Sequence, residues 1–137
     1  MQRTADLPLR STIDDGWKST AYLAVFWLLA VVGLPVMTGA WLLPPVASLE
    51  ELTEQGKAVA AGTSTAGTTF FYGVLPLVLA HVVGLVLLCT IGGAGRYNRC
   101  SGLLLGVGAV AAASIVGLTV TLIIFGGQLV ATSNYVP

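Results

Sequence analysis

The chain has 137 residues, of which 55% are hydrophobic and only 9% are charged. Soluble domains usually carry about 25% charged residues, so this composition excludes an ordinary soluble protein and indicates the membrane class. Six basic and six acidic residues give a formal net charge of zero, which removes the electrostatic case for binding nucleic acid. We therefore expect an all-α, polytopic membrane protein in which residues 1–137 form a single membrane domain with three transmembrane helices.

The N-terminal 18 residues are polar and precede a long apolar run. A secretory signal would have a shorter apolar core, and the three aspartates in this segment argue against a mitochondrial presequence. The run is therefore interpreted as an uncleaved membrane helix. Ser11 and Asp14 are predicted to cap a short turn that lies on the membrane surface.

The first predicted span covers about residues 21–43. Trp17 and Trp41 lie near its two ends, as expected for side chains at the two membrane interfaces. Pro35 lies inside the span and removes one backbone hydrogen bond, which predicts a kink. Because Pro44–Pro45 follow, the helix is predicted to stop there.

The loop 44–69 is predicted to contain a short amphipathic helix near residues 49–61, lying along the interface. Ser48 and Glu51 have the spacing of a capping box, in which each side chain accepts from the other residue's backbone amide. Gly62 is a plausible stop for this helix. Two interpretations remain open: an acidic docking surface, or a solvated connector that rests on lipid headgroups.

The second and third predicted spans cover about residues 70–92 and 102–127. Pro76 predicts a kink in the second span. A short basic turn that contains Arg96 and Arg99 joins the two spans.

Basic residues predict the orientation of the chain. The N-terminal segment carries three and the turn before the third span carries two, whereas the 44–69 loop carries only Lys57. The positive-inside rule then places the N-terminus inside and the C-terminus outside. Cys89 and Cys100 are expected near the inner face, where thiols stay reduced. The Ala/Val/Gly/Leu-rich composition favours a bacterial inner (plasma) membrane, with an organellar inner membrane as the alternative.

Small residues form a strip along the third span, and they follow one another at steps of four, three, four and four residues. At about 100° per residue they fall on one side of a helix. Such a strip lets another helix approach closely in lipid, where dispersion contacts drive packing. The residues of the strip are Gly102, Gly106, Ala109, Ala113 and Gly117. The strip either packs against another helix of the same chain, which we favour, or binds a partner protein.

His81 is the one titratable side chain near the middle of a span. It has two candidate roles. As a cofactor ligand it would bind haem, or hydrogen-bond a quinone, with a second ligand from another helix. As a structural residue it would form a polar pin with Ser114, which lies at a similar depth in the third span. We favour the structural role and expect no metal site.

Pro35, Pro76 and Thr121 are predicted to share one layer of the outer leaflet. One hypothesis is that the two kinks splay the helices there and leave a groove for a lipid tail or a partner's helix. The alternative is simple tolerance of the kinks, with the Thr121 hydroxyl bonded to a carbonyl of its own helix.

The sequence contains no nucleophile with its base, no zinc cluster and no phosphate loop. We therefore expect no enzymatic activity. The favoured function is a non-catalytic accessory subunit of a larger membrane complex, such as a respiratory or other energy-converting one, with other integral membrane subunits and lipids as partners. The alternatives are a haem- or quinone-binding anchor that uses His81, and a small self-associating channel or carrier.

Overall fold

The computed structural model describes residues 16–131, so the turn predicted at Ser11 and Asp14 lies outside the described residues. Three of the described helical segments are long and apolar enough to cross a membrane. The predicted all-α, multi-pass membrane fold is thereby confirmed. The elements are α1 (Thr20–Ala60), the π-helical turn η1 (Thr69–Val74), α2 (Leu75–Gly95) and α3 (Arg99–Ile124).

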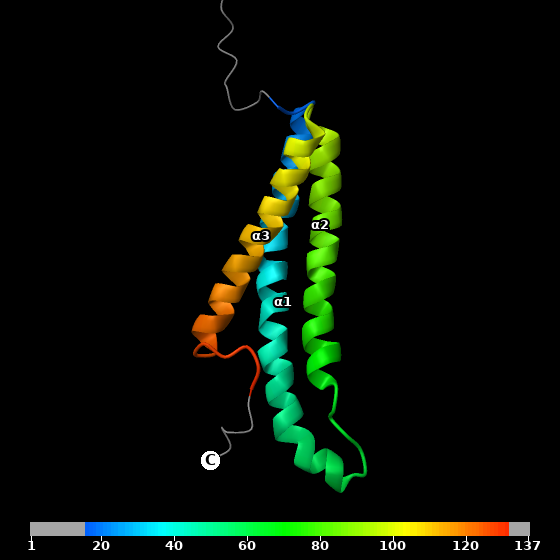
Figure 1. Ribbon diagram of the computed structural model, residues 1–137, viewed down its shortest axis with the longest axis vertical. Helices are drawn as coiled ribbons and strands as arrows, with labels where there is room; N and C mark the ends of the chain where they lie inside the picture. The colour runs from blue at the N-terminus through cyan, green and yellow to red at the C-terminus, as the bar shows by residue number, and fades with distance from the viewer. Residues whose placement is uncertain (1–15, 132–137) are drawn as a thin grey trace, which may run out of the picture.

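The three helices pack against one another, but α3 changes its neighbour along its length. α1 and α2 run side by side, and α3 leaves the end of α2 and diverges from it (Figure 1). Near its start α3 touches α2 at Gly92, and near its end it touches α1 at Met37, Thr38 and Trp41. Each helix therefore contacts both of the others.

α1 does not stop at Pro44–Pro45, so that prediction is wrong. The helix continues to Ala60, and its last part bends away from the axis of the rest (Figure 1). Each proline removes only one amide donor, and the resulting defect is buried under η1. A Cβ atom added at Gly73 of η1 would lie 2.8 Å from Pro44 Cα, which shows how closely this turn covers the prolines.

The predicted short helix at 49–61 is consequently the end of α1, not a separate interfacial helix. The predicted capping box is also wrong. Ser48 Oγ instead donates to the Pro45 carbonyl oxygen at 2.9 Å and accepts from the Ala131 amide at 2.8 Å. In a continuous helix the amides after Ser48 already have partners, so no free donor is left to cap.

Gly62 ends α1 as predicted. It has φ +73°, a left-handed conformation that glycine adopts without a steric penalty. The Thr63 amide donates to the Ala58 carbonyl oxygen at 2.8 Å, and the Gly62 amide donates to the Val59 carbonyl oxygen at 3.0 Å. This pair of bonds is a Schellman motif, which satisfies the last carbonyls of the helix.

The two prolines of the predicted kinks have different settings. Pro35 lies inside α1, which continues through it. Pro76 lies in the first turn of α2, directly after the π-helical turn. η1 and α2 form one unbroken helix over Thr69–Gly95, so Pro76 leaves a carbonyl of the preceding turn without its amide donor, next to the π-helical turn.

Residues 16–18 and the basic turn lie at the same end of the bundle. The Lys18 amide donates to the Gly95 carbonyl oxygen at 2.7 Å, and the Tyr97 amide donates to the Gly16 carbonyl oxygen at 3.1 Å. The Arg96 guanidinium stands over the Trp17 ring, 5.6 Å from its centroid. This shared location is what the positive-inside argument requires; the side of the membrane that it faces stays a prediction.

The small-residue strip of α3 is used within the chain. Gly102, Gly106, Ala113 and Gly117 are buried, and Ala109 is half-buried. A Cβ atom at Gly102 would collide with the backbone of Gly92. The same addition at Gly106 would lie 2.8 Å from the Cys89 amide nitrogen, and at Gly117 it would lie 2.7 Å from Trp41 Cδ1. The first part of the strip therefore receives α2, and the last part receives α1.

Gly106→Ala is expected to destabilise the bundle, whereas Gly108→Ala is not. Both changes raise helix propensity by about 1 kcal/mol. A Cβ at Gly108 has no neighbour within 4 Å, but one at Gly106 meets the α2 backbone. The free energy of unfolding of Gly106→Ala, measured in detergent micelles, should therefore lie about 1–3 kcal/mol below that of Gly108→Ala. Equal stabilities would show that the strip is not packed internally.

Candidate functional site

Three polar side chains, one from each long helix, meet inside the bundle; we call Trp41, His81 and Ser114 the polar node. His81 Nε2 lies 2.9 Å from Ser114 Oγ. Trp41 Nε1–H donates to the same hydroxyl oxygen at 3.0 Å. The structure thus brings together the two residues of the predicted pin and adds a tryptophan from α1 to them.

The hydrogen-bond partners fix the protons of the polar node. His81 Nδ1 lies 2.8 Å from the Leu77 carbonyl oxygen, which can only accept, so Nδ1 carries the proton of the neutral ring. Nε2 is then an acceptor, and Ser114 donates its hydroxyl proton to it. The Ser114 oxygen in turn accepts from Trp41. Each donor is matched to one acceptor, which is the arrangement that low-dielectric surroundings favour most.

This arrangement bears on the predicted cofactor role of His81. A haem ligand needs a free lone pair on a ring nitrogen, and the Nε2 lone pair is engaged by Ser114. The Trp41 ring stands edge-on to the imidazole, with the ring centroids 6.2 Å apart. Cofactor binding at His81 would therefore require Ser114 to give up its hydrogen bond. Within residues 16–131, no group of three or more metal-binding side chains comes together.

Sequence reasoning assigned Trp41 to the interface and missed its place in the polar node. The feature of the sequence that could have indicated this place is the spacing of Ser114 and Gly117 on α3. Gly117 leaves a notch one turn after the serine, and the indole lies in that notch. An indole N–H buried in hydrocarbon needs an acceptor, and Ser114 is the one within reach.

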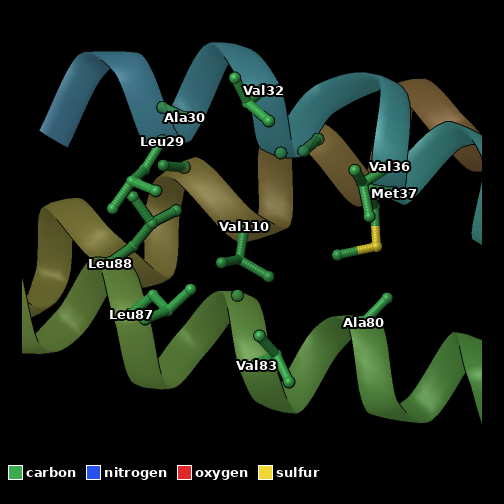
Figure 2. Close-up of a pocket in the computed structure, with 14 residues that line it drawn as sticks. Leu29, Ala30, Val32, Val36, Met37, Ala80, Val83, Leu87, Leu88 and Val110 are labelled. Atoms are coloured by element: carbon green, nitrogen blue, oxygen red, sulfur yellow. The ribbon is translucent and has the colours of Figure 1, made fainter. Parts of the chain in front are cut away.

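An apolar groove of about 240 Å³ lies beside the polar node (Figure 2). Val110 of α3 lies at its back, between α1 and α2. Its lining residues are all apolar: Leu29, Ala30, Val32, Gly33, Val36 and Met37 of α1, Ala80, Val83, Gly84, Leu87 and Leu88 of α2, and Ala109, Val110 and Ala113 of α3.

This groove is not the one predicted from Pro35, Pro76 and Thr121, because none of these three residues lines it. Thr121 is buried and donates to the Gly117 carbonyl oxygen of its own helix at 2.9 Å. The simpler interpretation of Thr121 therefore holds. Six of its 14 lining residues are glycine or alanine.

The end of α1 and the segment that returns to η1 form a small polar unit, which we call the polar head (residues 50–69). The Thr69 amide donates to the Glu51 carboxylate at 2.8 Å. Thr65 Oγ1 lies within hydrogen-bond distance of the Glu51 carbonyl oxygen and of the Gln55 side chain. Hydrogen bonds from Thr69 to the carboxylate lower the pKa of Glu51.

Cys89 and Cys100 form no disulfide with each other. Cys89 is half-buried and lies 3.7 Å from the Leu103 carbonyl oxygen, and Cys100 is exposed. They lie on the half of the bundle that carries the basic turn.

Comparison with protein-family models, with curated proteins and with solved structures found no match to this chain. The functional argument consequently depends on the geometry of its own residues.

Ser114→Ala should cost about 1–3 kcal/mol in unfolding free energy, because it leaves His81 and Trp41 without their shared partner. In a double-mutant cycle, Trp41→Phe and Ser114→Ala should cost clearly less together than the sum of their separate costs. Thr119→Val is the matched control, since the Thr119 hydroxyl bonds only its own helix on an exposed face. Strictly additive costs would contradict a coupled node.

Acidification should open the polar head. A carboxylate whose pKa is lowered by folding stabilises the folded form above its unfolded pKa, and this contribution is lost as pH falls through the folded pKa. The amide chemical shift of Thr69, followed by NMR in micelles from neutral to acidic pH, should report this opening. Glu51→Gln should remove the titration, and Glu50→Gln should leave it unchanged. A Thr69 shift that titrates equally in both variants would refute the assignment.

Proposed function

We propose that this protein is a non-catalytic accessory subunit of a larger membrane complex, with a respiratory or other energy-converting complex as its setting. The observation that supports this most is the polar node. His81 is the one titratable side chain deep in the described spans, and its two ring nitrogens bond Leu77 and Ser114. Proton relays and ion pathways usually need available ionisable groups within the membrane.

A partner would have to bind a surface that the chain does not use for itself. The strip of α3 is occupied by α1 and α2, whereas the outward face of α1 exposes large apolar side chains. Leu28 is 63% exposed and Val31 is 67% exposed on this face. α1 has 41 residues, or about 61 Å at 1.5 Å per residue, which exceeds a hydrocarbon core of about 30 Å. The polar head therefore extends the same helix beyond the membrane and offers polar contacts.

The alternative functions gain less support from the same contacts. A haem- or quinone-binding anchor would need His81 to leave Ser114. A self-associating channel would need the small-residue strip to face a second copy, and packing within the chain occupies it. We place the subunit in a bacterial inner membrane, among integral membrane subunits and lipids.

The test is purification of the tagged full chain from its native membrane in mild detergent, followed by native electrophoresis and mass spectrometry. We expect one complex that contains larger integral membrane proteins at fixed stoichiometry. The paired change Leu28→Ala and Val31→Ala should release the chain from this complex. The pair Leu104→Ala and Ile115→Ala is the matched control, because these residues are equally exposed on α3.

Two outcomes would overturn the proposal. A symmetric oligomer of this chain alone would favour the channel or carrier. A haem band in the reduced-minus-oxidised spectrum that is lost in His81→Phe would favour the anchor.

A further inference from the structure

The groove between α1 and α2 lies at a depth where only hydrocarbon surrounds the protein. Ala80 and Leu88 bound it along α2, and they are 15 and 7 residues from Gly95. At 1.5 Å per residue the groove lies about 10 to 22 Å from the end of the bundle where Lys18 meets Gly95. A hydrocarbon core of about 30 Å that starts near this end places the groove across the midplane.

Packed side chains lie beyond both ends of the groove along α1. Towards Lys18, the fully buried ring of Phe26 packs on Trp17, with ring centroids 5.4 Å apart. Towards the other end lie Met37 and the polar node. Ala80 and Ala113 of the groove precede His81 and Ser114 directly in the sequence, so the node lies beside the groove.

The rim of the groove is open to the surroundings of the bundle. Val32, Val36 and Val83 are each half-exposed, and Gly33 contributes no side chain between them. A Cβ atom added at Gly33 would have no neighbour within 4 Å. The hollow is therefore an unfilled recess in the side of the bundle, not a void sealed by the fold.

We propose that this groove binds the terminal part of a phospholipid acyl chain. Acyl chains are the one component that reaches this depth at high concentration in any bilayer. The lining offers only methyl and methylene groups and the small residues between them, so it recognises hydrocarbon and excludes a headgroup or a polar ligand. Its volume exceeds the 150 Å³ of an engineered apolar cavity that binds benzene. The groove thus holds a tail while the rest of the lipid stays in the leaflet.

This inference depends on membrane insertion alone and is independent of the proposed subunit role. A bound tail would fill the recess between α1 and α2 beside the polar node, where the side chains of the two helices leave space between them. The chain would then carry an acyl tail as part of its packing.

The test uses the full chain in lipid nanodiscs that contain a phospholipid with a photoreactive diazirine on one acyl chain. With the diazirine near the methyl end, cross-links should concentrate on groove residues such as Val83 and Leu87. With the diazirine near the carbonyl group, they should not. Gly33→Leu, which places a side chain in the groove, should reduce the groove cross-links several-fold.

Gly39→Leu is the matched control, because Gly39 also lies on α1 with open space around it but does not line the groove. This variant should leave the cross-links unchanged. The melting temperature of both variants shows that they are folded. If Gly33→Leu does not fold, Ala80→Leu fills the groove from the α2 side and repeats the test.

Equal cross-linking in Gly33→Leu and Gly39→Leu would overturn the proposal. So would a prenyl quinone that copurifies with the protein and is lost only in Gly33→Leu, because the occupant would then be an isoprenoid tail. Equal yields of groove cross-links from both diazirine positions would also refute the binding of the terminal part of the acyl chain.

Discussion

Hydrocarbon gives one apolar helix no hydrophobic reason to pack on another, so this bundle depends on the close approach of backbones. The contact of Gly102 with Gly92 is the tightest case, since a methyl group on either residue would collide with the other's backbone. Gly106 and Gly117 continue this approach along α3, first towards α2 and then towards α1. Because one strip serves two neighbours in turn, α3 has to cross from one to the other, which is the divergence from α2 visible in Figure 1.

The polar node fixes the position at which the three helices meet. A glycine contact sets how closely two helices approach but constrains their register less than a directional hydrogen bond does. Ser114 supplies the direction, because its single hydroxyl donates to His81 of α2 and accepts from Trp41 of α1. The groove next to the node is lined in part by small residues, among them Gly33 of α1 and Gly84 of α2.

The errors in reading the sequence have a common physical cause. Pro44 and Pro45 were predicted to stop the helix because each lacks the backbone amide that a helix needs. That argument considers only the local sequence and omits the packing of Gly73 of η1 on Pro44. Ser48 and Glu51 look like a capping box for the same reason: their spacing is right, but the continuous helix leaves no free amide between them. Their side chains bond Ala131 and Thr69 instead, which are distant in sequence.

The sequence by itself determined the membrane class, the three spans, the stop at Gly62, the packing strip of α3 and the pairing of His81 with Ser114. These follow from composition, helical period and depth, which are local or one-dimensional quantities. The tertiary structure decided that α1 continues through its two prolines, that Trp41 joins the polar node, and that the groove lies between α1 and α2. Each of these depends on how the side chains and backbone groups of one helix meet those of a neighbouring helix. The residue spacing within a single helix does not determine these contacts.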